Sequence, residues 1–363
     1  MSDRRLVGPV RIVGAGLLGS SIGLALRQHG VDVILADVSP SSVTLAVDYG
    51  AGRLAAEGDN PDLIVVCVPP DVTATIVAAE LAAYPNALVT DVASVKSAPL
   101  AELRALGADI SRYIGSHPMA GRERGGAASA RADLFVGRPW VIAGHDGISY
   151  RRAAPVEDLA LDLGALPIEM DVVEHDASVA LVSHVPQVVA SLLAARLQEA
   201  SDTAIGLAGQ GLRDTTRIAS SAPELWVQIL GANAPRSAEI LAAFRTDLDR
   251  VITALESPDA QGSRRAIAET IASGNAGVAR IPGKHGQARH FARITVKVDD
   301  KPGELARLLT EIGELGVNME DLTLEHSPGA QIGLAEIAVV PEVEITLIAE
   351  LEKRGWKIAG VTQ

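Results

Sequence analysis

Short apolar runs recur along the first half of the chain, each about as long as a buried strand. Segments with helical or loop-like patterns separate them. Strands that alternate with helices are typical of a mostly parallel, doubly wound sheet, so the pattern predicts an α/β domain over residues 1–171. The predicted strands are residues 10–13, 33–36, 63–68, 87–91, 113–116, 140–143 and 166–170.

Three segments follow predicted strands and carry polar or rigid residues: Pro69-Pro70, residues 91–96 and His117-Pro118. In doubly wound sheets, ligands bind beyond the carboxyl ends of the strands. We therefore expect all three segments to face one crevice.

A glycine-rich turn connects the first strand to a helix. Its glycines permit a tight turn, close approach of the backbone to a pyrophosphate, and close packing of the helix on the sheet. The first amides of the helix then face the phosphates. The residues of the turn and of the helix start are Gly14, Gly16, Leu17, Leu18 and Gly19.

The second predicted strand is followed by an acidic residue, Asp37. A carboxylate there accepts hydrogen bonds from the hydroxyls of an adenosine ribose and repels a 2′-phosphate. Val68 and Pro69, at the end of the next predicted strand, are expected to contact the cofactor as well. Strand, glycine turn, helix, strand and acidic residue in register predict a Rossmann-type domain that binds NAD.

Helical patterns replace the strand patterns after residue 171, which predicts an all-α domain over residues 172–284. A long helical candidate over residues 176–200 contains Pro186, so a kink or break is expected. A helical domain too elongated to enclose its own core would bury its apolar faces against a second copy. We therefore expect a homodimer.

Ser221 and Glu224 have the spacing of a capping box, with Pro223 near the start of a helix that carries Trp226. Two more helices are expected near residues 235–255 and 259–273.

A third unit is predicted over residues 291–363, after a linker near residues 280–289. Its strand and helix patterns follow the order βαββαβ, over residues 291–298, 304–315, 322–325, 332–340, 342–354 and 356–361. This order resembles the ACT domain, a small amino-acid-sensing module. The turn and ligand loop of that module correspond to a set of residues here that includes Asp300, Pro302, Gly303 and Asn318. The alternative is that these residues only build turns.

Composition indicates a soluble enzyme of the cytoplasm. The chain of 363 residues is long enough for two or three domains, and its formal charge of −13 argues against nucleic acid or an anionic membrane as the main partner. No stretch has the length and uninterrupted apolarity expected of a membrane span. The single cysteine, Cys67, lies in an apolar run and suggests a packed core thiol. The eight histidines show no metal-ligand spacing, so no metal is expected.

His117 is the candidate catalytic residue. It follows an apolar run within the segment Gly115-Ser116-His117-Pro118-Met119-Ala120-Gly121. A hydride-transfer enzyme needs a proton acceptor near its cofactor, and imidazole has a pKa suited to that task near neutrality. The alternative is an inert, hydrogen-bonded loop histidine.

The whole chain resembles the prephenate/arogenate dehydrogenase family, which makes the tyrosine precursor, in the form that carries a C-terminal ACT domain. The resemblance rests on motifs that occur in order over both catalytic domains. They are residues 14–19, Asp91-Val92-Ala93-Ser94-Val95-Lys96, residues 116–121, His175-Asp176, Ser183-His184-Val185-Pro186, residues 213–219, Pro223 and Trp226. The combination is specific although each motif alone is not.

The resemblance implies NAD-dependent oxidative decarboxylation of prephenate. It makes His117 the acceptor for the proton of the substrate 4-hydroxyl and Ser94 a hydrogen-bonding partner of that group or of the imidazole. Arg217 would hold a substrate carboxylate, for which a guanidinium is suited, and Glu123 resembles the family's gating acid. The structural alternatives are a helix cap for Ser94, a solvated charge for Glu123 and a helical ion pair of Arg217 with Asp214.

Two residues depart from the family pattern. Gln187 stands where many members have a histidine, and Arg122 replaces a smaller polar residue. Both bear on the choice between prephenate, which we expect, and arogenate, the alternative. Arg213 is a further candidate for binding a substrate carboxylate. Because the end product of the pathway is an amino acid, tyrosine is the expected feedback ligand of the ACT-like unit.

Two other classes of function compete with this interpretation. A two-domain dehydrogenase acting on a β-hydroxyacid or an imine would share the glycine turn and the helical domain, but it would leave Ser94, His117 and Arg217 together unexplained. A catalytically inactive amino-acid sensor would need only the last unit, which an intact cofactor fingerprint argues against.

Overall fold

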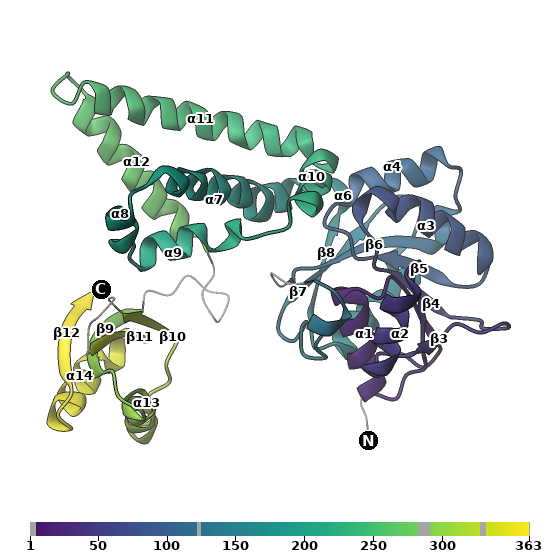
Figure 1. Cartoon of the computed structure of the whole chain (residues 1–363), viewed down its shortest axis with the longest axis horizontal. Coiled ribbons are helices and arrows are strands. Elements are labelled where there is room, and N and C mark those ends of the chain that lie inside the picture. The colour runs from purple at the N-terminus through teal and green to yellow at the C-terminus, as the bar shows by residue number, and fades with distance from the viewer. Residues whose placement is uncertain (1–4, 122–124, 282–290, 327–331, 363) are drawn as a thin grey trace. The chain divides into compact units, whose positions relative to one another are not determined.

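The computed structural model describes residues 5–121, 125–281, 291–326 and 332–362 (Figure 1). The chain divides into two compact units. The first comprises Met1–Glu199 with Thr216–Phe244, and the second comprises Ala200–Thr215 with Arg245–Gln363.

The first unit contains an eight-stranded sheet in the order β3-β2-β1-β4-β5-β6-β7-β8. Neighbouring strands from β3 to β6 run parallel, β7 is antiparallel to β6, and β8 is parallel to β7. The mostly parallel sheet predicted by the sequence is therefore confirmed. The strands are β1 (Val10–Val13), β2 (Val33–Ala36), β3 (Arg53–Leu54), β4 (Leu63–Val66), β5 (Leu88–Asp91), β6 (Tyr113–Pro118), β7 (Pro139–Gly144) and β8 (Leu166–Asp171).

Helices cover both faces of this sheet (Figure 1). On β4, Leu63 and Val65 join the core under one set of helices, while Ile64 and Val66 join the core under the other. A strand buried on both faces appears in the sequence as an uninterrupted apolar run, which explains the pattern of the first half of the chain. The first set is α1 (Leu17–Gln28), α2 (Pro40–Asp48) and α5 (Tyr150–Asp162), and the second is α3 (Pro70–Ala83) and α4 (Ser97–Ala105).

The long helical run after the sheet is interrupted before Pro186. Helix α6 (Val172–Val179) passes into one π-helical segment, Ala180–His184, and α7 (Val185–Ala195) follows. Proline lacks the amide of a regular helix and its ring displaces the carbonyl of the preceding turn, so the hydrogen-bond ladder is irregular just before it. The kink or break expected at Pro186 is thus present only as a π-helical irregularity, and the helical run continues from Val172 to Glu199.

The predicted capping box is wrong. Helix α10 (Pro223–Ala232) has Ala222 as its N-cap, and no side chain caps it. The Ser221 hydroxyl instead donates to the Ile218 carbonyl at 2.8 Å, within the turn that follows the short helix Arg217–Ala219. A bond to the preceding turn competes with the cap, as short hydroxyl side chains commonly allow.

The expectation that no segment matches a membrane span needs correction. Among the described residues, the helical run Val172–Glu199 is long and apolar enough to cross a bilayer by length and composition. The run also contains His175, Asp176 and His184, which are buried within the unit and hydrogen bonded there. These residues hold the first half of the run in the unit, whereas Leu181, Val182 and Leu192 are exposed and only a third of the most apolar stretch is buried.

The second unit contains helices from the middle of the chain and a separate sheet. Its helical elements are α8 (Asp202–Gly206), most of α9 (Gln210–Thr216), the second half of α11 (Ala234–Glu256), and α12 (Ser263–Val278). Helix α12 begins at Ser263, after Gly262 in a left-handed conformation, rather than at residue 259 as predicted.

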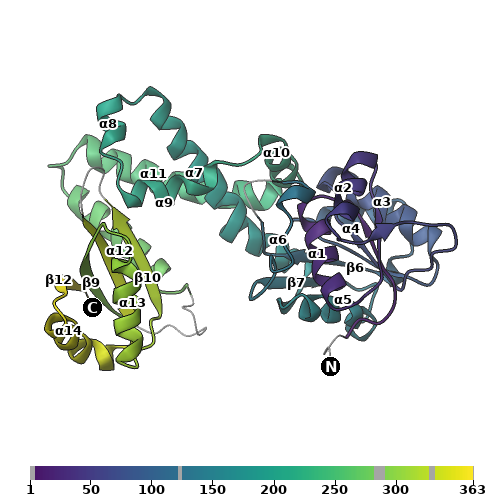
Figure 2. The same cartoon turned by 60° about the horizontal axis from the view of Figure 1, so that its bottom comes forward.

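The C-terminal sheet is antiparallel, with the order β10-β11-β9-β12. Helices α13 and α14 pack on the same face and share one apolar core with the sheet (Figure 2). The predicted order βαββαβ is confirmed. The elements are β9 (Ala292–Asp299), α13 (Glu304–Glu314), β10 (Asp321–His326), β11 (Ile332–Val339), α14 (Glu344–Lys353) and β12 (Lys357–Thr362).

Candidate active site

The glycine turn between β1 and α1 has the shape that the sequence predicts. Gly14 has φ +106°, which disfavours any residue with a side chain, and a Cβ there would collide with the Cys67 carbonyl. A Cβ on Gly19 would collide with the Gly14 carbonyl, so the helix packs as closely on the turn as the fingerprint requires. At Gly14 and Gly19 the turn therefore has no room for a side chain.

The N-terminus of α1 is open to a ligand. Its N-cap, Gly16, offers no side chain to the first amides, and a Cβ built there would meet no atom within 4 Å. Asp37, just beyond β2, accepts hydrogen bonds from the Ala15 amide at 2.6 Å and the Ser39 amide at 2.7 Å. These bonds hold its carboxylate against the turn.

This set of residues fits a dinucleotide. The open helix N-terminus suits a pyrophosphate and the carboxylate at the end of β2 suits a ribose. Leu17 and Leu18 lie half-buried in the first turn of α1, and Val68 and Pro69 lie between β4 and α3.

His117 lies within β6 rather than after it. The parallel pairing with β5 ends at Gly115, and His117 is paired with Val141 of the antiparallel strand β7. Strand β6 therefore extends beyond the carboxyl end of β5. The predicted position at that edge of the sheet is right, but the side chain is held by a strand and is only 9% exposed.

A chain of three buried side chains ends at His117. Its Nδ1 lies 2.9 Å from Nε2 of His175, and Nδ1 of His175 lies 2.8 Å from Oδ1 of Asp176. Both partners belong to α6, so this helix supports the candidate base from behind. Among the described residues, none hydrogen bonds Nε2 of His117.

Asp176 also fixes α4 to α6. Its two carboxylate oxygens accept the backbone amides of Lys96 and Ser97, each at 2.9 Å. Those amides begin α4, whose N-cap residue provides no capping side chain. Asp176 thus caps a neighbouring helix while it holds His175.

A buried lysine lies close to this chain. Lys96 forms an ion pair with Asp91, which also accepts a hydrogen bond from the Tyr113 hydroxyl at 2.7 Å. Lys96 and Asp91 are almost completely buried. Burial lowers the pKa of Lys96, and the Asp91 carboxylate opposes that change.

The electrostatics keep the histidines neutral and Asp176 charged. Burial, with the neighbouring His175 and Lys96, holds the pKa of His117 well below its usual value. Burial also lowers the pKa of His175, although the hydrogen bond that its ring donates to Asp176 opposes this change. Burial alone would raise the pKa of Asp176, but the hydrogen bonds from His175, Ser97 and Lys96 outweigh it and lower that pKa to about 2.

A third histidine, His184, ends the π-helical segment. The Asn233 side-chain amide donates to the Asp176 carbonyl at 2.7 Å and lies 3.2 Å from Nδ1 of His184. Nε2 of His184 is buried without a hydrogen-bond partner among the described residues. Trp226 lies edge-on to the His184 ring, 6.2 Å between centroids. Burial lowers the pKa of His184 to about 4.

The remaining predicted residues differ in how they are placed. Ser94 is half-buried in the loop after β5 and is not the cap of α4, so the helix-cap alternative is wrong. Gln187 is buried on α7, and its Oε1 lies 3.5 Å from the Ser221 hydroxyl. Arg217 is exposed and forms no ion pair with another described residue. Arg213 is exposed on α9. Arg122 and Glu123 lie outside the described residues.

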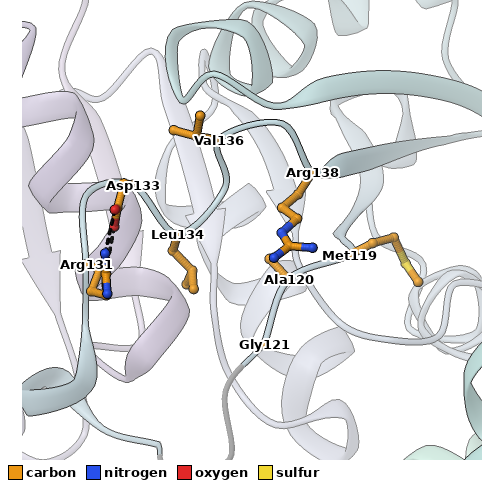
Figure 3. Close-up of a pocket in the computed structure, with 8 residues that line it drawn as sticks. All are labelled: Met119, Ala120, Gly121, Arg131, Asp133, Leu134, Val136 and Arg138. Atoms are coloured by element: carbon orange, nitrogen blue, oxygen red, sulfur yellow. Dashed lines mark hydrogen bonds and ion pairs between the residues drawn. The ribbon is translucent and has the colours of Figure 1, made fainter. Parts of the chain in front are cut away.

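A cavity of about 440 Å³ lies beside the segment that follows β6 (Figure 3). Arg138 points toward Met119 and Ala120 on one side, and the ion pair of Arg131 with Asp133 lies on the other. None of the glycine-turn residues and none of the three histidines lines it. We therefore place the chemistry at His117 rather than in this cavity.

Sequence reasoning missed the roles of His175, Asp176 and Lys96, although it used all three as motif residues. The available signal was an adjacent histidine and carboxylate at the start of an apolar helix. Their contacts join residues 58 to 80 positions apart, which only the fold reveals. Among the described residues, no group of three or more His, Cys, Asp or Glu side chains is placed to hold a metal ion.

Comparison with known proteins places these observations in context. A family model described as "Prephenate dehydrogenase, nucleotide-binding domain" matches residues 22–166, and one described as "Prephenate dehydrogenase, dimerization domain" matches residues 171–269. The chain is 36% identical over 356 residues to the probable prephenate dehydrogenase NovF of Streptomyces niveus, covering 95% of this chain and 98% of that protein.

Two solved structures are also similar. Prephenate dehydrogenase from Aquifex aeolicus, in complex with hydroxyphenyl propionate and NAD⁺, has a TM-score of 0.65 and 25% identity, covering 75% of this chain and 99% of that one. Synechocystis arogenate dehydrogenase has a TM-score of 0.61 and 28% identity, covering 74% of this chain and 99% of that one.

Because three histidines are buried, we expect the folded protein to lose stability in mild acid. In the unfolded chain, His117, His175 and His184 take up protons near pH 6.5, whereas in the native state their pKa values are lowered. The unfolded state therefore binds more protons as the pH falls below about 6.5, at a cost of up to roughly 1.4 kcal/mol per pH unit for each histidine. We expect the free energy of unfolding in urea to fall steadily from pH 7 to about pH 5. An unchanged value over that interval would show that the histidines titrate normally in the native protein.

Proposed function

Because the chain belongs to the prephenate dehydrogenase family, we propose that it catalyses the NAD-dependent oxidative decarboxylation of prephenate to 4-hydroxyphenylpyruvate. The observation that supports this most is the buried, neutral His117 at the edge of the sheet, beside a domain that binds NAD. When bound, NAD⁺ supplies the acceptor for the hydride that leaves C4 of the ring. Gly14, Gly16 and Asp37 would hold the cofactor.

The role of His117 follows from its neutral imidazole. Its Nε2 accepts the proton of the substrate 4-hydroxyl, which raises the electron density on that oxygen and favours departure of hydride from C4. Loss of CO₂ then makes the ring aromatic, and the proton returns to the phenol oxygen of the product. The half-buried hydroxyl of Ser94 is a hydrogen-bonding partner for the same group.

Substrate carboxylates need cationic partners. Arg217, exposed and without an ion pair among the described residues, is our first candidate, and Arg213 the second. Gln187 is buried and uncharged, so it can hydrogen bond the substrate side chain without attracting or repelling its charge. Glu123 remains a proposal from the family resemblance.

The choice of prephenate over arogenate is supported by the name of the Streptomyces niveus relative. Arogenate is the alternative, because a structurally similar protein is an arogenate dehydrogenase. The two substrates differ in a pyruvyl against an alanyl side chain. Formation of NADH from each substrate, compared at equal concentrations, tests the proposal: faster oxidation of arogenate would overturn it.

We also propose a cytoplasmic homodimer with three domains, over residues 1–171, 172–284 and 291–363. The description of the second family model as a dimerisation domain supports the dimer. So does an exposed apolar row on α11, since residues spaced about one turn apart share a helix face. The row consists of Phe244, Leu248, Ile252 and Leu255.

The C-terminal unit is proposed to bind tyrosine. Gly303 begins α13 in a left-handed conformation, Pro302 precedes it, and Asp300 follows β9. The Asn318 amide donates to Glu320 at 3.2 Å. By resemblance to an ACT domain, this turn and Asn318 would form the ligand loop.

Replacing His117 with asparagine should remove the proton acceptor. We expect kcat to fall by roughly 10²- to 10⁴-fold, the usual contribution of a general base, with little change in the Kd for NAD⁺. The measurement is NADH formation with saturating prephenate, alongside NAD⁺ titration. Near-native turnover in the folded variant would show that His117 has only a structural role.

Replacing Arg217 with alanine should weaken substrate binding. A hydrogen bond to a charged group contributes about 1.5–3 kcal/mol, so we expect KM for prephenate to rise by roughly ten- to 150-fold. The Arg217→Lys variant keeps the charge without the planar fork and should fall between the two. An unchanged KM in Arg217→Ala would transfer this role to Arg213 or Arg122.

Truncating the chain after Ile281 removes the ACT-like unit. We expect the truncated protein to lose inhibition by tyrosine and to keep its turnover. Coupling between an effector and a substrate site is typically about 1–3 kcal/mol, which is a five- to 150-fold change in apparent affinity. Inhibition is measured with and without tyrosine in both proteins, after the dimer has been verified. Equal inhibition of the two would place tyrosine in the active site instead.

A further inference from the structure

We propose that His175 and Asp176 are positioning residues that fix His117 in the one tautomer able to accept the substrate proton. The inference deepens the proposed function and rests on it. It concerns two residues that do not touch the reacting atoms but determine which nitrogen of His117 carries a proton.

The first step is the charge state of Asp176. Its carboxylate accepts three hydrogen bonds at most 2.9 Å long, from the Lys96 amide, the Ser97 amide and the His175 ring. An ionised carboxylate has only acceptors, so every one of these partners must be a donor. Nδ1 of His175 therefore carries a proton.

The proton on Nδ1 of His175 also fixes the tautomer of His117. In a neutral imidazole one nitrogen donates and the other accepts. Since Nδ1 of His175 donates to Asp176, its Nε2 must accept, and the partner at 2.9 Å is Nδ1 of His117. Nδ1 of His117 is then the protonated nitrogen. The lone pair is therefore on Nε2, and no described residue donates a hydrogen bond to it.

Asp176 and His175 are held so that they cannot easily rearrange. Asp176 is fixed to the start of α4 by two amides, and its own carbonyl accepts the Asn233 side chain at 2.7 Å. His175 is completely buried between Asp176 and His117. If His117 were to carry its proton on Nε2, its Nδ1 lone pair would face the lone pair of His175. A buried pair without a shared proton loses its hydrogen bond and leaves both acceptors unsatisfied.

The arrangement also supports His117 after it takes up a proton. The positive charge then lies one imidazole away from the Asp176 carboxylate, which stays charged because its pKa is about 2. The charged and titratable groups that act on His117 are His175, Lys96, His184 and Asp176, and only Asp176 favours the protonated form. This carboxylate therefore opposes the effect of burial without contacting His117.

Two substitutions at His175 separate positioning from mere packing. In His175→Gln, the side-chain oxygen can still accept from Nδ1 of His117, whereas His175→Leu fills the space without an acceptor. We expect kcat to fall no more than about tenfold in the glutamine variant and roughly 10²- to 10⁴-fold in the leucine variant, the range over which general bases act. KM for the substrate and the Kd for NAD⁺ should stay close to those of the wild type in both.

A third variant guards against misfolding of the leucine protein. Asp176→Asn has the same shape, but it lacks the negative charge and offers a single acceptor oxygen to the two amides and the ring that Asp176 binds. With its NH₂ at the Oδ1 position the variant favours the opposite tautomer of His117, and with its NH₂ at the Oδ2 position it still loses the charge that supports protonated His117. In either case kcat should fall by at least about 10²-fold, within the range of general-base catalysis. Thermal unfolding and NAD⁺ binding establish that each variant is folded.

The results of these variants can be told apart from a failure of the proposed substrate. The assay uses whichever of prephenate and arogenate the wild type oxidises, so a wrong substrate assignment leaves the ratio between variants measurable. Equal kcat values for His175→Gln and His175→Leu, at either level, would overturn the proposal. So would a folded Asp176→Asn protein with the turnover of the wild type.

Discussion

The site depends on one buried charge, the carboxylate of Asp176. A carboxylate that is only 4% exposed is costly unless its lone pairs are fully used, and here two amides and a histidine ring use them. The two amides begin α4 and the ring supports His117. The same charge therefore orients a helix and the candidate base. Removing it would leave helix amides and an imidazole without their acceptor.

The fold brings the candidate site residues to one edge of the sheet from two directions. Gly14 and Asp37 lie beyond the ends of β1 and β2, as the parallel topology requires for a nucleotide site. His117 belongs to a strand that outruns its parallel neighbour because the antiparallel strand β7 pairs with its last residues. Helix α6 then closes the site from behind and supplies the two supporting side chains. A strand and a helix hold the base more firmly than a loop would.

Much of this architecture was predictable from local pattern. The fully apolar run of β4 and the glycines before α1 are determined by burial on two faces and by close approach of backbones, and both leave a direct trace in the sequence. The C-terminal order βαββαβ was equally visible, because β9 alternates buried and exposed positions. Other features have no local trace. The Ser221 hydroxyl donates to the preceding turn and does not cap α10. The contact of His117 with His175 joins residues 58 positions apart. The histidine contact depends on the packing of α6 against the sheet, whereas the Ser221 bond is a choice between two nearby partners.

The tautomer of His117 is the most direct test of this account. In protein labelled with ¹⁵N only in histidine, the ring nitrogens of His117 can be identified by comparison with His117→Asn, and their protonation can be measured near neutral pH. The account predicts a neutral ring with the proton on Nδ1 and an unprotonated Nε2. A proton on Nε2, or a fully protonated ring at neutral pH, would contradict it.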